Sequence, residues 1–575
     1  MDYNSNLRKL RANLKELEIN SIIVSMSSSF SNSDDNFSDI RFISGFSGSN
    51  GRAIVSEEKA ILSVDGRYTK QAKEQTDNSV WKIESYPEVD VVKMMTDVLK
   101  KGKTLAVSSF SVTYKTYLSI LELSRKIGFK LLALRVHPIL EEKPIIKSTA
   151  SLVLMNEKYM GETIKDRINR IKETLKDNEA TLLADKVTIG WTFGIRRSEL
   201  ASDKSVLVNC VAFIPKIGVP VLFCDLSLKD KTSDFEIRSL DEFEEYIKAS
   251  AKLTVNLDYK NTPAYFALIL ENNKFEIKPF VREYGSFEAV KNETEIENQK
   301  VGANLTSLAF IETLAFLENA KKTSEVEVAK FFENKIMENK NGIGLSFTAI
   351  SAFEKNTSIV HYNPLACGNK EIFGKGLFLF DAGAHFNNAT TDMTRIIYRG
   401  ENPPEEYKLI YSIVLKSLIM FSAARFPNDS FAACIDSIAR YPVWKAGYDY
   451  AFGTGHGVGC FGNVHEHPRI SKSSQDKITK NMILTVEPGI YCESFGIRLE
   501  NMLLTKSSSE NPRFIQFETL NFIPFCRKLI KKETLDNTEI DWLNNYHNQV
   551  FEKFKDKLNA DQITFNWLKE NTKEI

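Results

Sequence analysis

The chain has 575 residues, of which 43% are apolar and 11% aromatic, a composition typical of a soluble globular protein. A chain of this length exceeds what one hydrophobic core supports, so we expect about three domains. Lys plus Arg and Asp plus Glu balance at 75 each, which gives no electrostatic reason to bind nucleic acid or an anionic membrane. Function is therefore expected from a local site.

Three features of the sequence bear on its compartment. The N-terminal residues form a charged amphipathic pattern without the apolar stretch of a secretory signal. No run of roughly 18 or more apolar residues occurs, which predicts that no helix spans a membrane. The 7 cysteines are an odd set without Cys-x-x-Cys spacing, which argues against a disulfide framework or a structural zinc site. We therefore expect a cytoplasmic protein whose cysteines are reduced.

The first half of the chain alternates between helical and strand-like patterns. Residues 7–18 have helical periodicity, and strand-like segments punctuated by glycine follow. After a KPIIK connection at 143–147, a second alternating set begins with a helix-like stretch at 156–178. This alternation predicts two α/β domains, residues 1–147 and 148–287, and permits a related fold in both.

The second half has longer elements. Helical periodicity marks four stretches: 293–319, 324–339, 404–423 and 428–448. Apolar, β-favouring runs around polar turns predict hairpins at 377–397 and 482–505. Helices on one face of an antiparallel sheet give the third domain, 288–575, an α+β architecture. A charged helical extension is expected from about residue 528, and it contains the segment WLNNYH at 542–547.

The first predicted hairpin brings two like charges together. If its turn lies between Phe386 and Asn387, Asp381 falls directly opposite Asp392 on the neighbouring strand. Side chains that face each other in this way are roughly 4.5–5.5 Å apart at Cβ, and like charges there repel. Either both aspartates lie on a solvated face or in Asx turns, or a cation lies between them.

The second predicted hairpin repeats this arrangement. With a turn centred on Glu493 and Ser494, Glu487 falls opposite Glu500. Pro488 marks the end of the strand, because proline cannot donate to a sheet. Two opposed carboxylate pairs in one domain, both embedded in apolar strands, favour a cation site.

A third component is the glycine-rich segment GTGHGVG at 453–459, with His456 at its centre. Glycines on both sides let the imidazole approach a ligand closely. The glycine spacing does not fit a dinucleotide-binding fingerprint. Four carboxylates and one imidazole form a hard ligand set that suits Mn²⁺ or Co²⁺ at least as well as Zn²⁺. This is the ligand count of a two-metal site.

Two further histidines lie in neighbouring motifs: His361 in SIVHYNP and His465 in NVHEHP. From the residues alone, each is as readily a core histidine with a satisfied hydrogen bond as a functional group. Cys460, beside the glycine-rich segment, lacks the paired base that would make it a nucleophile.

With these residues in view, the chain resembles the pita-bread metallopeptidases, and among them the three-domain cytosolic Xaa-Pro aminopeptidases. The segments similar to the catalytic signatures of that family, in the family's order, are IVHYNP, FDAGAHF, TTDMTR, GTGHGVG, NVHEHP, TVEPGIY and GIRLEN. ISGFSGSNG with VDGRY resembles the creatinase-type N-terminal domain, and WLNNYH resembles the C-terminal extension of the cytosolic members. The resemblance implies a C-terminal pita-bread catalytic domain preceded by two creatinase-like α/β domains.

The resemblance also implies an activity. The enzyme would bind two divalent metal ions, most commonly Mn²⁺, with Co²⁺ or Zn²⁺ as alternatives. It would release the N-terminal residue from peptides that have proline in the second position, by attack of a metal-bridging hydroxide on the scissile carbonyl. The metal ligands implied by motif position are Asp381, Asp392, His456, Glu487 and Glu500.

The same motif positions imply further roles. Glu487 would also shuttle a proton between water and the leaving proline nitrogen. His361 and His465 would hydrogen-bond the substrate carbonyl or the tetrahedral intermediate. Arg498 lies two residues before Glu500 and therefore on the same strand face, where it is a candidate partner of a carboxylate ligand.

One residue departs from the family pattern, which commonly reads His-Gly-Thr-Gly-His. This sequence has Phe452 in place of the first histidine. The resemblance assigns that position to substrate contact, so we expect Phe452 to alter substrate preference and to leave metal binding intact.

Two other functions fit parts of the sequence. A prolidase shares the five ligands but cleaves only dipeptides, and the two preceding domains and the WLNNYH segment favour the aminopeptidase. Non-catalytic pita-bread modules of histone chaperones lose the metal ligands, whereas this chain keeps them. The resemblance further implies a cytoplasmic homodimer that acts on peptides. The balanced charge and the lack of a membrane-spanning run predict no nucleic-acid or membrane partner.

Overall fold

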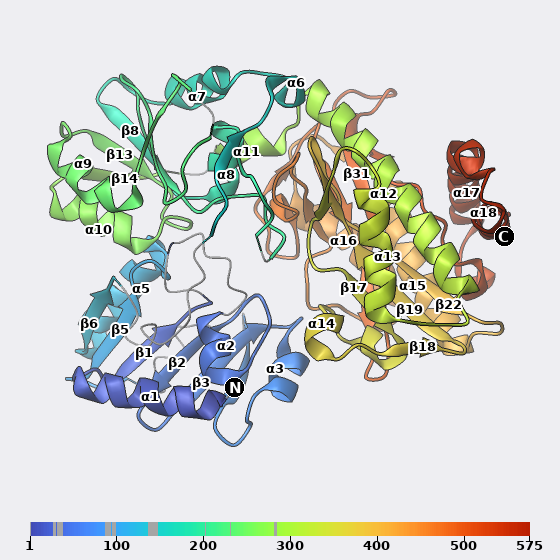
Figure 1. The fold of residues 1–575 in the computed structure, drawn as a ribbon, viewed down its shortest axis with the longest axis horizontal. Coiled ribbons are helices and arrows are strands. Elements are labelled where there is room, and N and C mark those ends of the chain that lie inside the picture. Colours follow the sequence, from blue (N-terminus) through green and yellow to red (C-terminus); the bar gives the residue numbers. More distant parts are fainter. Residues whose placement is uncertain are drawn as a thin grey trace. The chain divides into compact units, whose positions relative to one another are not determined.

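The computed structural model describes residues 2–26, 30, 38–86, 94, 99–135, 148–201, 203–229, 232–280 and 284–575. The chain forms two compact units (Figure 1). The first consists of Met1–Met155, Glu162–Ser202 and Leu207–Tyr284, and the second of Asn156–Gly161, Asp203–Val206 and Gly285–Ile575. The separation of residues 1–147 from 148–287 stays a prediction, and its connecting segment 143–147 lies outside the described residues.

The first unit contains two six-stranded sheets with the same topology. Their strand orders are β4-β3-β2-β1-β5-β6 and β12-β11-β10-β8-β13-β14. In each sheet the central strand, β1 or β8, is antiparallel to one neighbour and parallel to the other. The two outermost pairs of each sheet are parallel. The related fold that the sequence permitted is therefore confirmed at the level of strand order and direction.

The strands of the first sheet are β1 (Ser21–Val24), β2 (Arg52–Ser56), β3 (Ala60–Asp65), β4 (Lys82–Tyr86), β5 (Thr104–Ser108) and β6 (Lys130–Leu134). Those of the second are β8 (Glu179–Leu183), β10 (Val211–Pro215), β11 (Val221–Phe223), β12 (Glu236–Arg238), β13 (Thr254–Leu257) and β14 (Glu276–Pro279). A small separate sheet pairs β7 (Leu152–Leu154) with β9 (Ile195–Arg197). Among the described residues up to 289, the α-helices are α1 (Tyr3–Glu16), α2 (Asp39–Ser44), α3 (Thr69–Gln75), α5 (Tyr114–Ile127), α6 (Glu157–Met160), α7 (Ile164–Glu173), α8 (Lys186–Thr192), α9 (Phe243–Ala249), α10 (Ala264–Asn272) and α11 (Tyr284–Ala289).

The helix-like stretch predicted at 156–178 forms two helices, α6 and α7, rather than one. Gly161, with φ at 72°, adopts the left-handed conformation that ends α6. Thr163 and Asp166 then form a capping box that starts α7. Apolar periodicity alone did not reveal this break, because it is set by the backbone of one glycine.

The second unit has the predicted α+β architecture. Its functional part is built on a three-stranded antiparallel sheet, β17-β19-β22, and a six-stranded sheet, β23-β32-β31-β28-β25-β26. Helix α12 packs on β20 and β21, and α13 packs on β16 and β17. In Figure 1 these two helices, in yellow-green, cross in front of β17, β19 and β22. The helices and sheets share one large apolar core.

The α-helices from residue 293 onward are α12 (Glu293–Asn319), α13 (Glu325–Met337), α14 (Pro364–Cys367), α15 (Glu405–Ser422), α16 (Ala432–Lys445), α17 (Asn537–Leu558) and α18 (Gln562–Asn571). The strands before α15 are β15 (Lys322–Ser324), β16 (Gly342–Leu345), β17 (Ile350–Phe353), β18 (Glu371–Phe373), β19 (Gly376–Ala382), β20 (Ala384–Phe386), β21 (Ala389–Thr390) and β22 (Met393–Arg399). Those after it are β23 (Arg425–Pro427), β24 (Ser430–Phe431), β25 (Gly455–Gly457), β26 (Glu466–Ile470), β27 (Lys477–Ile478), β28 (Ile483–Val486), β29 (Gly489–Tyr491), β30 (Gly496–Arg498), β31 (Asn501–Ser507) and β32 (Phe514–Thr519).

The four long helices predicted in this half of the chain are all present, as α12, α13, α15 and α16. Helix α12 begins at the predicted residue because Asn292 and Glu295 form a capping box there. By length and composition α12 could also cross a membrane. However, 61% of its most apolar window is buried inside the protein, as in a core helix.

The second hairpin has the predicted register, and the first does not. Gly489 pairs with Arg498 and Val486 with Asn501, so Glu487 and Glu500 fall opposite each other where the two strand pairs meet. In the first hairpin Asp381 pairs with Thr394 instead of Asp392.

The turn of the first hairpin falls on Asn387 and Asn388, because Phe386 is only 1% exposed and pairs with Ala389 inside the sheet. The register is therefore shifted by two residues from the prediction. A shift of two keeps a side chain on the same face of a strand, so Asp392 becomes a diagonal neighbour of Asp381.

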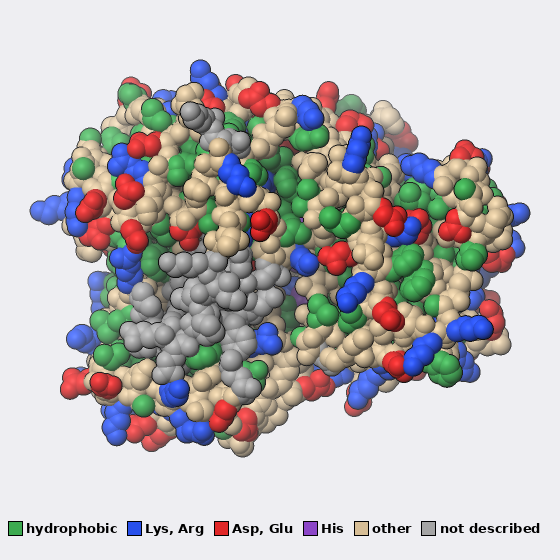
Figure 2. All heavy atoms as spheres, in the orientation of Figure 1, with side chains coloured by type: hydrophobic (Ala, Val, Ile, Leu, Met, Phe, Trp, Pro, Cys, Tyr) green, Lys and Arg blue, Asp and Glu red, His purple; other side chains and the backbone are tan. Residues whose placement is uncertain are grey.

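Charged side chains on the face drawn in Figure 2 are interspersed, with Lys and Arg beside Asp and Glu. No single-sign patch dominates the described part of that face. This distribution agrees with the balanced composition of the chain.

Candidate metal centre

Five candidate ligand side chains from both sheets meet in the second unit. Asp381 lies in β19 and Asp392 directly precedes β22, whereas His456 lies in β25, Glu487 follows β28 and Glu500 precedes β31. Together with His465, these side chains place their potential ligand atoms in three groups, each within 4.8 Å: Asp381 with Asp392 and Glu500, His456 with Glu487 and Glu500, and Asp392 with His456 and His465. The groups overlap, so the side chains surround one continuous space.

Burial makes this cluster costly without a cation. Asp381, Asp392 and Glu500 are 7%, 5% and 1% exposed. The Oδ1 atom of Asp381 and the Oε1 atom of Glu500 are buried without a hydrogen-bond partner. Buried polar atoms are normally paired, so these two oxygens have the environment expected of metal ligands. The donor set therefore fits divalent ions.

The pKa values reflect the same repulsion. Burial raises the pKa of Asp392 well above its usual range, the charges of Glu500, Asp381 and Glu487 raise it further, and Arg498 partly opposes the shift. Burial also raises the pKa of Glu500, again with contributions from Asp381 and Glu487. These carboxyl groups compete for positive charge, which divalent ions would supply.

The imidazole of His456 is oriented by a backbone hydrogen bond. Its Nδ1 atom lies 3.0 Å from the carbonyl oxygen of Gly457. A carbonyl only accepts, so Nδ1 carries the proton and Nε2 presents its lone pair. That Nε2 atom is 3.6 Å from Oδ2 of Asp392 and 3.6 Å from Oε1 of Glu487. This is the tautomer that a metal ligand requires.

Arg498 connects the two hairpins. It is 2% exposed and forms an ion pair with Oδ2 of Asp381. Its Nη1 atom donates to the hydroxyl of Tyr491 and, at 3.2 Å, to the carbonyl of Val360. Its Nε atom is 3.4 Å from Oγ1 of Thr394. The guanidinium thus holds one oxygen of Asp381 and leaves the other to face the site.

Thr394 and Tyr491 are neighbours of the site that were not predicted. Oγ1 of Thr394 donates to Oε2 of Glu500 at 2.9 Å. Burial raises the pKa of Tyr491 to about 12, so the phenol stays protonated beside Arg498. Strand spacing was an available signal for Thr394, which lies two residues after Asp392 and so on the same face.

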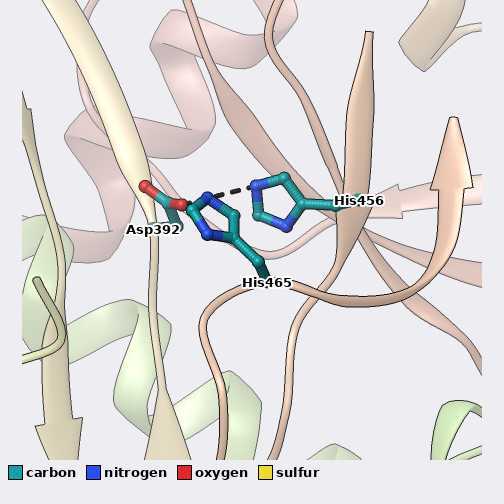
Figure 3. A group of neighbouring side chains, drawn as sticks. All are labelled: Asp392, His456 and His465. Carbon is teal, nitrogen blue, oxygen red and sulfur yellow. Dashed lines mark ion pairs between the residues drawn. The ribbon is translucent and has the colours of Figure 1, made fainter. Parts of the chain in front are cut away.

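His465 lies in the loop before β26, close to the candidate ligands. Its ring centroid is 4.4 Å from that of His456, and Figure 3 shows both imidazoles projecting toward Asp392. The next residue, Glu466, forms an ion pair with Lys291, and the two side chains are 4% and 3% exposed. This buried pair, also not predicted, anchors the loop that carries His465.

His361 lies outside the three groups of ligand atoms. Its segment is held by the fully buried carboxylate of Glu325, which accepts four hydrogen bonds. The donors are the backbone N–H groups of Phe353 and Lys370, at 2.8 and 2.9 Å, Nδ2 of Asn356 at 2.9 Å and the hydroxyl of Tyr362 at 2.8 Å. The residue next to His361 is therefore fixed in the core.

Phe452 lies in the loop that leads into the glycine-rich segment. Arg440, 1% exposed, forms an ion pair with Asp436 at 2.6 Å and donates to the carbonyl of Phe452 at 2.5 Å. The Phe452 ring packs against Tyr450 and Tyr491, with centroids 5.1 and 5.8 Å apart. The loop therefore presents an apolar aromatic surface where the family pattern has an imidazole.

Comparison with known families agrees with this geometry. Metallopeptidase family M24 matches residues 297–507, and the C-terminal region of peptidase M24 matches residues 513–575. The creatinase/prolidase N-terminal domain matches residues 6–132. The chain belongs to the M24 metallopeptidases and is a metal-dependent hydrolase of peptides.

Within this class, the similar proteins are Xaa-Pro aminopeptidases. A probable Xaa-Pro aminopeptidase P of Paracoccidioides brasiliensis is 31% identical over 100% of both chains. One of Tuber melanosporum is also 31% identical over 100% of both chains. The crystal structure of X-prolyl aminopeptidase from Caenorhabditis elegans, described as a cytosolic enzyme with a di-nuclear active site, covers 100% of both chains at 26% identity and a TM-score of 0.92.

The raised pKa values predict that the metal-free protein becomes less stable as pH rises. Asp392 and Glu500 bind protons in the folded state at pH values where they have lost them in the unfolded state. The free energy of unfolding therefore falls as pH rises from the ordinary carboxyl range, about pH 4, through the raised pKa values. Asn in place of Asp392 removes one of these groups.

We expect the stability difference between chelated wild type and Asp392→Asn to shift in favour of the variant as pH rises from about 5 to 8. Urea unfolding across this range measures the difference. Metal binding requires ionised carboxylates, so the apparent affinity of wild type for Mn²⁺ should rise over the same range. A stability difference that does not change with pH would contradict the prediction.

Proposed function

We propose that the chain is an aminopeptidase that releases the N-terminal residue from peptides with proline in the second position. The observation that carries the proposal is the convergence of four carboxylates and His456 in a chain similar over its full length to Xaa-Pro aminopeptidase P relatives. The proposal extends to a cytoplasmic location and a homodimer, which the family resemblance implies.

Two divalent ions are the proposed cofactor, with Mn²⁺ as the metal and Co²⁺ or Zn²⁺ as substitutes. The residues that would hold them are Asp381, Asp392, His456, Glu487 and Glu500. Carboxylate oxygens outnumber nitrogen in this set, and such hard ligands suit Mn²⁺. When bound, the ions polarise the scissile carbonyl and make a water molecule acidic enough to attack it at neutral pH.

Glu487 is suited to move the proton. Its side chain is 22% exposed, against 7% for that of Asp392, so it reaches toward solvent while its Oε1 atom stays near His456. In the proposed reaction Glu487 takes the proton of the attacking water and delivers it to the proline nitrogen as the peptide bond breaks.

Histidines on separate loops would stabilise the charge that develops on the substrate. His465 stands beside His456 at the metal site, where an N–H can reach the carbonyl oxygen as it becomes negative. His361 follows Val360, whose carbonyl accepts from Arg498. Its proposed role is to hydrogen-bond the substrate from a segment that Glu325 keeps rigid.

A prolidase is the nearest alternative, since it would use the same ligands. The structure of a prolidase from Thermococcus sibiricus shares the fold, with 21% identity, a TM-score of 0.50 and coverage of 64% of this chain. The Xaa-Pro aminopeptidase P relatives extend over the whole chain. A non-catalytic module is disfavoured because the ligand side chains are retained.

Hydrolysis of matched peptides tests the function. Metal-free protein reconstituted with Mn²⁺, Co²⁺ or Zn²⁺ is given Xaa-Pro dipeptides and Xaa-Pro-Yaa tripeptides, and free N-terminal residue is quantified. We expect release from the tripeptides, with highest turnover in Mn²⁺, and none from Xaa-Ala-Yaa controls. Cleavage of dipeptides alone would identify a prolidase, and no turnover with any metal would favour a binding module.

Substrate preference is expected to depend on Phe452. The Phe452→His variant restores a hydrogen-bonding group next to Tyr491 and should change the relative kcat/KM values across a panel of Xaa-Pro-Yaa peptides. A change of about tenfold for some substrates is the expected size, because one hydrogen bond to a bound group contributes about 1–2 kcal/mol. Mn²⁺ affinity should stay the same.

Tyr448→His is a suitable control, because Tyr448 is 38% exposed on the same chain segment outside the site. Unchanged kcat/KM ratios in Phe452→His across the whole panel would show that this position does not set specificity.

A further inference from the structure

The WLNNYH segment, residues 542–547, has no role in the proposed chemistry, yet Leu543, Tyr546 and His547 are buried in the core. It lies in α17, near the C-terminus in Figure 1. Tyr546 and His547 are 3% and 0% exposed. Trp542 stacks on Tyr546 with ring centroids 5.4 Å apart, and Nε2 of His547 accepts the backbone N–H of Phe525 at 3.1 Å. The buried side chains of this segment therefore hold the chain around Phe525 inside the second unit.

Arg395 is the side chain that connects this segment with the candidate metal ligands. It lies in β22, three residues after Asp392, and is 0% exposed. Neighbouring residues of a strand point to opposite faces. Thr394 faces the carboxylate of Glu500, so Arg395 points away from the ligands into the layer beneath them.

The guanidinium of Arg395 donates hydrogen bonds to three separate segments. Nη1 donates to the carbonyl of Glu500 at 2.7 Å, and Nη2 donates to Oδ1 of Asn501 at 2.8 Å. Nε and Nη2 donate to the carbonyl of Ile523 at 3.1 and 3.0 Å. Nη2 also donates to the hydroxyl of Tyr546 at 2.8 Å. Every one of these acceptors is neutral.

A buried cation is costly unless its donors are satisfied, so the position of this guanidinium depends on each acceptor. Tyr546 supplies the acceptor that comes from α17. Its hydroxyl also accepts the backbone N–H of Ile523 at 3.0 Å and can donate to the carbonyl of Ile523 at 3.0 Å. The ring of Phe525 completes the enclosure, 4.3 Å from the Arg395 guanidinium.

Glu500 is consequently held from two sides. Its carboxylate accepts from Thr394 at 2.9 Å, and its carbonyl accepts from Arg395 at 2.7 Å. Both contacts originate in β22, the strand that begins directly after Asp392. The backbone N–H of Glu500 also donates to the carbonyl of Thr394 at 3.1 Å. Arg395 thus contributes to the spacing between Glu500 and Asp392, which come from different sheets, by fixing the carbonyl of Glu500.

We infer that Arg395, held by its hydrogen bond to Tyr546, is a positioning residue that fixes Glu500 relative to Asp392. Through Tyr546, helix α17 thereby raises the affinity of the site for divalent metal ions. The inference rests on the proposed function in one respect, namely that these carboxylates bind metal. Residues that orient metal ligands contribute about 10- to 100-fold to metal affinity or activity.

The test compares two Tyr→Phe variants of the full chain. Tyr546→Phe removes the hydroxyl that contacts Arg395 and keeps the ring. Tyr411→Phe is the matched control, because Tyr411 is 0% exposed, against 3% for Tyr546, and its hydroxyl accepts a backbone N–H of the same segment, that of Cys526, at 2.8 Å. Mn²⁺ is titrated into each chelated protein by calorimetry, and thermal unfolding is recorded separately.

Both variants should lose thermal stability, and Tyr546→Phe should lose more, because its hydroxyl also accepts from the buried Arg395 guanidinium. Mn²⁺ affinity should fall about tenfold in Tyr546→Phe and change by less than about twofold in Tyr411→Phe. Arg395→Lys keeps the positive charge but loses the planar guanidinium that donates to several acceptors at once, so it should weaken Mn²⁺ binding at least as much. Tyr546→Phe decides the outcome if Arg395→Lys does not fold.

Wild-type Mn²⁺ affinity in Tyr546→Phe would overturn the inference. An equal loss in Tyr411→Phe would also overturn it, since general loosening would then account for both. Wild-type protein that binds no Mn²⁺ would overturn the proposed function and this inference with it, whereas intact wild-type binding with unaffected Tyr546→Phe overturns the inference alone.

Discussion

Repulsion between buried carboxylates is the constraint on which the second unit depends. Asp381, Asp392 and Glu500 are almost fully enclosed, with ligand atoms within 4.8 Å of one another. Arg498 neutralises one oxygen of Asp381, but Oδ1 of Asp381 and Oε1 of Glu500 have no partner. An arrangement of this kind persists only if the surrounding fold holds it and cations compensate it. Metal-dependent peptide hydrolysis is the activity that uses such a site.

The rigidity comes from polar groups buried behind the site. Glu325 fixes the segment that carries His361, and Arg440 fixes the loop that carries Phe452. The Lys291–Glu466 pair anchors the loop of His465. Each of these groups is almost fully buried, so each is rigid by virtue of satisfied hydrogen bonds. Candidate site residues on loops can therefore be held as firmly as those on strands.

The sequence alone indicated most of the side chains that meet at the candidate metal centre, because each belongs to a short local pattern. The register of the second hairpin followed from Pro488 and a symmetric turn. The register of the first hairpin was wrong by two residues, because the burial of Phe386 moved the turn. The alternation of side chains made that error harmless for Asp392.

Hydrogen bonds between residues far apart in the sequence could not be predicted from the sequence. Arg395 joins Glu500 and Tyr546 across 105 and 151 residues, and no periodicity connects such positions. The fold of the second half was accessible because the long helices are strongly periodic, whereas the break between α6 and α7 depended on the conformation of Gly161. Local pattern thus predicted the elements and the candidate ligands, and tertiary contacts determined how these side chains are held.

Anomalous scattering at the manganese absorption edge, from crystals of protein reconstituted with Mn²⁺, tests the central claim most directly. We expect two peaks about 3.5–4 Å apart. Their contacts should be Asp381, Asp392, His456, Glu487 and Glu500. A single peak, or ions that leave Asp381 or Glu500 outside coordination distance, would contradict the account.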